Sequence, residues 1–130
     1  MHIPVLLDEV MELLNPQLGE NFIDCTFGAG GHSRKILERI QSGRLLVIDW
    51  SEEAVRKCRE KFAECINDNY ANVPAIMRTS HFPAADGLIL DLGVSSEQWE
   101  SSGRGFSFQK DEPLLMTFHD SQKPVKSILK

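Results

Sequence analysis

The sequence has 130 residues, of which 42% are hydrophobic and 25% charged, and its formal net charge is −5. A chain of this length and composition forms one soluble globular domain at most, and it has no apolar run near the ~18 residues that cross a bilayer, so we expect it in the cytoplasm. The acidic balance argues against nucleic-acid binding by this chain alone, although residues 104–130 carry five Lys or Arg against three Asp or Glu.

Helical and strand patterns alternate along the first 92 residues. Pro4 and the apolar spacing predict a first helix that Asn15-Pro16 ends, and Ser51 can cap a later helix with Cys58 and Cys65 on its buried stripe. The predicted elements are, in chain order, a helix over 4–14, a strand over 22–27, a helix over 31–40, a strand over 44–48, a helix from 52, a weak strand over 66–70, a short helix over 72–80 and a strand over 86–92.

The predicted strands are continuously apolar rather than alternating, which is typical of parallel strands covered on both faces. Together with the alternation of strands and helices, this predicts an α/β, Rossmann-like, doubly wound parallel sheet. Ligands of such sheets bind outside the carboxyl ends of the strands. The residues expected near that edge are Asp24, residues 28–32, Asp49, Tyr70 and Asp91.

The stretch Phe-Ile-Asp-Cys-Thr-Phe-Gly-Ala-Gly-Gly-His-Ser, residues 22–33, indicates a strand that leads into a loop cleared of bulky side chains. Asp49 ends the next apolar run, where such folds place a carboxylate for ribose hydroxyls. Ser33 stands where a dinucleotide fingerprint has its third glycine, and no P-loop Gly-Lys-Ser/Thr follows. A cofactor with a ribose and no phosphate, such as S-adenosylmethionine, fits best; the alternative is a turn that only joins a strand to a helix.

The three cysteines, Cys25, Cys58 and Cys65, form no C-x-x-C pair and leave one unpaired in any disulfide scheme. We expect all three to be buried thiols. The four histidines show no metal-ligand spacing, so no metal site is predicted.

After Gly93 the chain is polar, rich in glycine and serine, and bears aromatic residues without periodicity. Loops this long are usually functional or disordered. Trp99, Arg104, Phe106 and Phe108 offer the stacking and charge that unpaired RNA bases require. The alternative for Phe106 and Phe108 is that they anchor a lid to its own core.

Four blocks, HIPVLLDEV, DCTFGAGGHS, GLILDLGVSSEQ and RGFSFQKDEPLLM, resemble one known family over residues 2–116. It is the MraW-type family of S-adenosylmethionine-dependent methyltransferases, which modify a cytosine N4 in small-subunit ribosomal RNA. The resemblance implies S-adenosyl-L-methionine as cofactor and, as partner, the small-subunit ribosomal RNA or the assembling 30S subunit. It implies neither a membrane nor a metal.

The resemblance also assigns roles to single positions. Gly30, Gly31 and His32 would line the methionine and ribose part of the cofactor, and Asp49 would hold the ribose hydroxyls. Tyr70 would lie beside the adenine, and Asp91 and Gln98 would complete the reactive side of the pocket. As alternatives, Asp49 and Asp91 could cap helices, and Tyr70 could be a half-buried core aromatic.

Asp91 is the residue we expect to act in catalysis. The N4 lone pair of cytosine is delocalised into the ring, so an acceptor for its N–H would localise that pair and take up charge in the transition state. Amino-methyltransferases of DNA carry an Asp/Asn-Pro-Pro-aromatic motif for this task, whereas this chain has Asp91-Leu92-Gly93-Val94.

Residues 111–118 depart from the family segment that resembles Asp-Gly-Pro-Leu-Asp-Met-Arg-Met, so a role of this segment in binding RNA is in doubt. Family members are about twice as long or more. We therefore expect residues 1–100 to form a cofactor-binding half domain with about four strands, and residues 101–130 to be a lid loop and the start of an inserted helical domain. An unpaired sheet edge would then favour low stability or self-association.

Three functions remain to be weighed. The first is the methyltransferase itself. The second is a truncated, catalytically incompetent fragment that binds the cofactor or associates with RNA. The third, a nucleotide-binding oxidoreductase, is disfavoured by Ser33.

Overall fold

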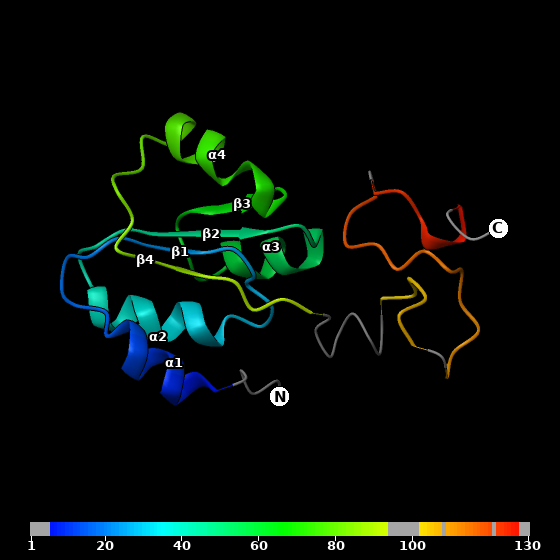
Figure 1. The fold of residues 1–130 in the computed structure, drawn as a ribbon, viewed down its shortest axis with the longest axis horizontal. Helices are drawn as coiled ribbons and strands as arrows, with labels where there is room; N and C mark the ends of the chain where they lie inside the picture. Colours follow the sequence, from blue (N-terminus) through cyan, green and yellow to red (C-terminus); the bar gives the residue numbers. More distant parts are fainter. Residues whose placement is uncertain (1–5, 94–101, 108, 121, 128–130) are drawn as a thin grey trace. The chain divides into compact units, whose positions relative to one another are not determined.

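The computed structural model of the chain describes residues 6–93, 102–107, 109–120 and 122–127. The chain divides into two compact units, Met1–Asp91 and Leu92–Lys130, and the first contains the sheet (Figure 1). We expected the division between residues 100 and 101. That point falls within residues 94–101, which lie outside the described ranges. Within the described ranges, no helix has the length and apolar character needed to span a membrane.

The described part of the first unit, residues 6–91, has four strands and four α-helices. The strands are β1 (Phe22–Asp24), β2 (Leu45–Asp49), β3 (Cys65–Asn67) and β4 (Gly87–Ile89). The helices are α1 (Leu7–Leu14), α2 (Gly31–Ile40), α3 (Glu52–Arg59) and α4 (Val73–Thr79), with a 3-10 turn, η1 (Tyr70–Asn72), before α4. Among the described residues of the second unit, the structure has a 3-10 turn, η2 (Val125–Ser127). The predicted helix over 31–40 matches α2, while β1 and β4 are shorter than predicted.

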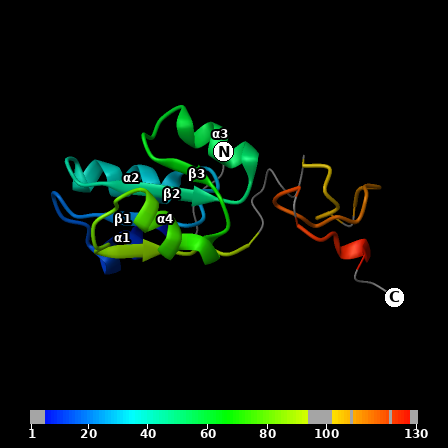
Figure 2. The ribbon, with the colours of Figure 1, turned by 90° about the horizontal axis from the view of Figure 1, so that it is seen from above.

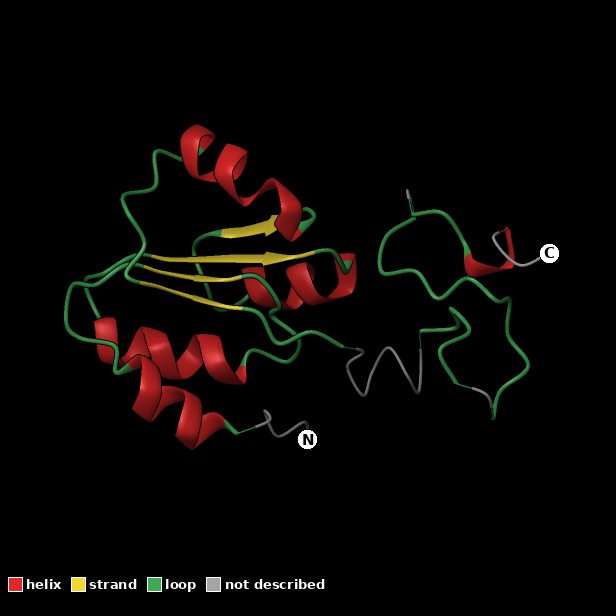
Figure 3. Cartoon of the chain, viewed as in Figure 1, coloured by secondary structure: helices red, strands yellow, loops and turns green. Residues whose placement is uncertain are grey.

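The four strands are parallel and lie in the order β3-β2-β1-β4. The chain therefore runs outward from β1 through β2 to β3 and then returns to place β4 on the other side of β1. Helices α1, α2 and α3 lie on one face of the sheet, and α4 lies on the other (Figures 1, 2 and 3). This confirms the predicted α/β doubly wound fold, with its switch of winding direction between β1 and β4.

The core consists of two clusters, one on each face of the sheet. Alternate strand residues point to opposite faces, so Phe22 and Val47 pack with α1, α2 and α3, while Ile23 and Leu46 pack with α4. The strands are covered on both faces, which explains their continuously apolar sequence. β4 is covered least: Leu88 is paired with Ile23 on the α4 side and remains 42% exposed.

The cysteines correct one expectation. α3 ends at Arg59, and Cys65 opens β3 instead of continuing the helix. Cys58 and Cys65 form a disulfide, so they are not the thiols we expected. A spacing of seven puts two side chains on one helical face, but it also fits a turn that brings a strand back onto the helix, and the sequence pattern does not separate the two cases. Cys25 is a buried free thiol, as predicted, and burial raises its pKa to about 11.

Candidate cofactor site

The loop between β1 and α2, residues 25–30, brings its backbone close to the carboxyl ends of the strands. Gly28 and Gly30 both have positive φ, +58° and +87°, which side-chain-bearing residues rarely adopt. A Cβ on Gly30 would also lie 2.6 Å from the ring of Phe27. Phe27 is buried and packs edge-to-face on Phe62, with ring centroids 5.6 Å apart. The loop is thus anchored to the core by Phe27; within it Gly28 is half-buried and Gly30 is buried.

Asp24, the last residue of β1, is fully buried and fixes the start of this loop. Its Oδ1 accepts a hydrogen bond from the Thr26 N–H at 3.0 Å, and its Oδ2 accepts one from the Ser33 hydroxyl at 2.6 Å. Burial raises the pKa of Asp24 to about 7, although the two hydrogen bonds oppose the rise. Ser33, which departs from the dinucleotide fingerprint, is therefore the partner of a buried acid.

Asp49 ends β2 and fixes the middle of the loop. Its Oδ2 accepts a hydrogen bond from the Gly28 N–H at 3.2 Å, and its Oδ1 accepts one from the Ser51 N–H at 2.8 Å. Burial raises the pKa of Asp49, and the backbone hydrogen bonds oppose the rise. The N-cap of α3 is Ser51, whose side chain accepts from the Ala54 N–H. Asp49 is therefore not the helix cap, and the backbone N–H groups of Phe27 and Trp50 also bind its carboxylate.

His32 lies in the first turn of α2 and is only 7% exposed. Its Nε2 is buried and has no hydrogen-bond partner among the described residues. Buried polar atoms are nearly always hydrogen-bonded, so this unsatisfied atom makes His32 a candidate ligand-binding residue. His32 follows Gly30 and Gly31, which places it at the same loop.

The remaining predicted site residues lie at the same sheet edge or outside the described chain. Asp91 follows β4 and is exposed; its backbone N–H donates to the Thr26 hydroxyl oxygen at 2.7 Å. Tyr70 opens η1 just after β3, and at 45% exposure it belongs to neither core cluster. Gln98 lies outside the described residues.

The chemistry of this edge suits a ribose-bearing ligand without a phosphate. Residues 24–33 contain no Lys or Arg, so the loop offers no such cation to a phosphate. Asp49 and Asp91 offer carboxylate acceptors, which hydroxyl and amino groups require. The described residues contain no group of three or more His, Cys, Asp or Glu side chains that could hold a metal ion.

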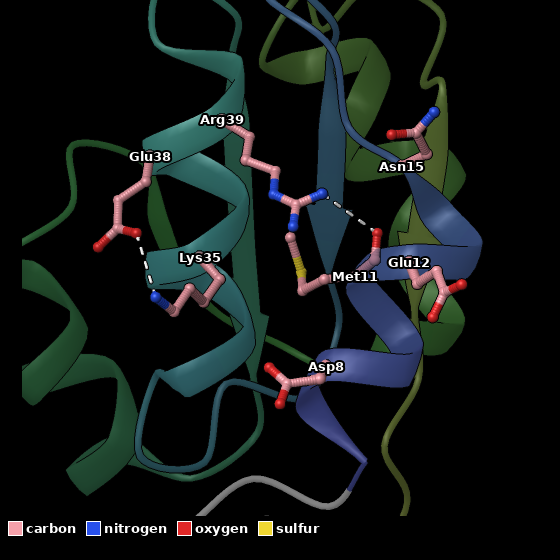
Figure 4. Close-up of a pocket in the computed structure, with 7 residues that line it drawn as sticks. All are labelled: Asp8, Met11, Glu12, Asn15, Lys35, Glu38 and Arg39. Atoms are coloured by element: carbon pink, nitrogen blue, oxygen red, sulfur yellow. Dashed lines mark hydrogen bonds and ion pairs between the residues drawn. The ribbon is translucent and has the colours of Figure 1, made fainter.

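A groove of about 410 Å³ lies between α1 and α2, and it contains none of the predicted site residues (Figure 4). Arg39 crosses it to donate to the Met11 carbonyl at 3.4 Å, and Lys35 pairs with Glu38 at 3.5 Å. Its acidic and basic side chains thus partly neutralise one another, and the groove offers no convergent set of groups for a cofactor.

Within the second unit, the candidate RNA-reading residues are engaged with their own unit. The Arg104 guanidinium donates to the Thr117 hydroxyl and pairs with Asp120, at 3.1 and 3.0 Å. Phe106 is buried and packs against Phe118, with ring centroids 5.4 Å apart. Phe106 is therefore an anchor of its own unit, which was the alternative interpretation. Trp99 and Phe108 lie outside the described residues.

Sequence reasoning missed the residues that support the site. Thr26 and Ser33 hold Asp24, and the Asn67 side chain donates to the carbonyls of Asp49 and Trp50, both at 3.0 Å. An acidic residue at the end of β1 was visible in the sequence, but no pattern specified which hydroxyl it would bind.

The parallel sheet with its switch point between β1 and β4 defines a Rossmann-like α/β domain. The model of the MraW methylase family matches residues 1–127, and the chain belongs to that family.

Relatives named "Ribosomal RNA small subunit methyltransferase H" include those of Nitrosomonas europaea, Mycoplasma capricolum and Finegoldia magna. They are 40%, 41% and 36% identical to this chain, over 94%, 88% and 97% of its length. The matched segments cover 40%, 40% and 42% of those proteins, so the chain spans about two fifths of their length.

The buried acid predicts a pH dependence of stability. The folded state holds the Asp24 proton up to about pH 7, whereas the ordinary pKa is 3.8, so between these values the folded state binds more protons. The free energy of unfolding should therefore fall as pH rises through this window, by at most about 1.4 kcal/mol per pH unit. Asp24→Asn keeps an acceptor for Thr26 and a donor for Ser33 but does not titrate. The free energy of unfolding of this variant should therefore fall less steeply with pH.

Urea unfolding between pH 4.5 and 8 measures this slope. Asp8→Asn makes the same change at an exposed position of α1 and serves as the control. A slope for Asp24→Asn as steep as that of the unaltered chain would contradict the assignment.

Proposed function

We propose that this chain is the cofactor-binding part of an S-adenosylmethionine-dependent methyltransferase that modifies the N4 of a cytosine in small-subunit ribosomal RNA. Membership of the MraW methylase family and the names of the relatives support an rRNA methyltransferase. The cofactor and the N4 position rest on the site residues and on the motif resemblance.

The observation that carries the proposal is the glycine loop bound to the carboxylate of Asp49, together with the buried His32 Nε2, which has no hydrogen-bond partner among the described residues. In this proposal Asp49 accepts hydrogen bonds from the ribose hydroxyls, and the ligand supplies the partner of the His32 Nε2. No cationic side chain in residues 24–33 calls for a phosphate instead.

In this proposal Gly30, Gly31 and His32 hold the methionine and ribose part of the cofactor, Asp49 its ribose hydroxyls and Tyr70 its adenine. An aromatic with 45% exposure at the end of β3 has the face that adenine stacking requires. S-adenosylmethionine, when bound, supplies a methyl group already activated by its sulfonium. The chain's own task is to orient the acceptor for in-line attack.

Asp91 serves the acceptor. Its carboxylate is exposed at the strand edge and makes no hydrogen bond to the described residues, so it is free to accept one from the cytosine amino group. That hydrogen bond would localise the nitrogen lone pair and take up positive charge as the new bond forms. Gln98 would complete this side of the pocket. The partner is the small-subunit ribosomal RNA or the assembling small subunit, which places the protein in the cytoplasm.

Calorimetric titration with S-adenosylmethionine tests the cofactor site. Asp49→Ala should weaken binding at least tenfold, because it removes an acceptor for the ribose and the hydrogen bond that positions Gly28. Asp49→Asn keeps one oxygen acceptor, so its affinity for S-adenosylmethionine should lie between those of Asp49→Ala and the unaltered chain. Asp8→Ala, the same truncation in the α1–α2 groove, should bind like the unaltered chain. Equal affinity of Asp49→Ala and Asp8→Ala would contradict the site.

Asp91→Ala separates a catalytic role from a binding role. In a complete enzyme that carries these residues, turnover on small-subunit rRNA should fall at least a hundredfold, while the affinity for S-adenosylmethionine should change less than threefold. Equal losses of turnover and affinity would make Asp91 a binding residue alone.

The alternative function is that the chain binds the cofactor or associates with RNA and does not catalyse methyl transfer by itself. The chain matches about two fifths of each relative. A folded protein that binds S-adenosylmethionine and leaves small-subunit rRNA unmodified would support this function over the first.

The exposed strand β4 supports self-association of the isolated chain. Leu88 of β4 is 42% exposed, Leu90 just after the strand is 48% exposed, and among the described strands β4 pairs with β1 alone. Uncharged edges of this kind pair with a second copy about a two-fold axis.

We expect a dimer or larger species in light scattering at micromolar concentration. Leu88→Lys/Leu90→Lys should shift it to monomer, while Leu13→Lys, an equally apolar but remote exposed position, should not. A monomeric unaltered chain with a cooperative melt would refute the expectation.

A further inference from the structure

Thr26 occupies an unusual place in the pairing of β1 with β4. The two strands pair in parallel from Phe22–Gly87 to Asp24–Ile89, and the Cys25 N–H extends the pairing by donating to the Ile89 carbonyl at 3.0 Å. Hydrogen bonds of a parallel pair recur every second residue, so the next donor on the β4 side is the Asp91 N–H. It donates to the side-chain oxygen of Thr26, at 2.7 Å, and not to a backbone carbonyl.

The reason lies in the turn that begins the glycine loop. The Thr26 N–H turns back to Asp24 Oδ1, so the main chain leaves the line of the strand at this residue. Asp24 is in turn held by the Ser33 hydroxyl of α2. The Thr26 side chain thus spans the gap that the departing backbone opens beside β4.

This contact is the one hydrogen bond between residues 90–93 and the rest of the described chain. Leu90, Asp91, Leu92 and Gly93 are all exposed, so burial does little to hold them. The position of Asp91 relative to the glycine loop therefore depends on the Thr26 hydroxyl.

We propose that Thr26 is a positioning residue for the methyl-transfer site: its hydroxyl fixes Asp91 beside the loop that receives the cofactor. The functional half of this inference rests on the proposed role of Asp91. Thr26 acts through the Asp91 backbone and touches neither the acceptor base nor the methyl group.

Amide hydrogen exchange of the ligand-free chain, followed by NMR, tests the contact without cofactor or RNA. Thr26→Val keeps the shape and removes the hydroxyl; exchange at the Asp91 amide should accelerate about fivefold to tenfold, the protection that one hydrogen bond of ordinary strength gives. Thr26→Ser keeps the hydroxyl and should restore protection. The Val47 amide, bonded to the Glu64 carbonyl on the far side of the sheet, reports whether the fold is intact and should not change. If Thr26→Val does not fold, Thr26→Ala takes its place.

Kinetics of a complete enzyme with the same substitutions test the consequence. Turnover should fall at least tenfold in Thr26→Val and stay within threefold in Thr26→Ser, with cofactor affinity within threefold in both. Unchanged Asp91 exchange in Thr26→Val, or full turnover despite faster exchange, would overturn the proposal. An unaltered protein that binds no S-adenosylmethionine would contradict the proposed function instead, and the exchange experiment would still decide the Thr26 contact.

Discussion

Two buried or half-buried carboxylates hold the loop between β1 and α2, and the rest of the site depends on them. Asp24 binds Thr26 and Ser33, and Asp49 binds Gly28 and Ser51. Each carboxylate joins the loop to an element that comes later in the chain, α2 for Asp24 and the start of α3 for Asp49. A glycine-rich segment would otherwise sample many conformations, so these four hydrogen bonds restrict the conformation of the loop.

Burying an acid is costly unless it is hydrogen-bonded or protonated, and Asp24 is subject to both effects. Its neighbours Asp49 and Asp91 add to the rise of its pKa, so three acidic groups lie around one loop. A ligand with hydroxyl and amino donors and no phosphate suits this concentration of acceptors, while a phosphate would add negative charge to it. The electrostatics and the absence of cations in residues 24–33 therefore favour the same class of ligand.

The sequence predicted the fold well because its signals are local. Apolar runs, the glycine cluster and the Ser51 cap gave β1, β2, α2 and α3, and the switch of winding followed from their order. The sequence analysis did not predict the disulfide between Cys58 and Cys65, nor the hydrogen bonds of Thr26 and Ser33. Those contacts join residues through the tertiary fold, and a hydroxyl leaves no periodic trace in the sequence.

The Cys58–Cys65 disulfide joins the end of α3 to the start of β3. A bridge closing so short a loop stabilises by about 2 kcal/mol through the unfolded chain, and only where the surroundings are oxidising. The cytoplasm keeps such pairs reduced. In the cytoplasm, the location proposed above, the protein would therefore be less stable than the same protein purified in air, and Cys58 and Cys65 would be thiols in the core cluster that includes Val55. The presence of reductant in the buffer would therefore determine whether the disulfide form or the dithiol form of the protein is measured.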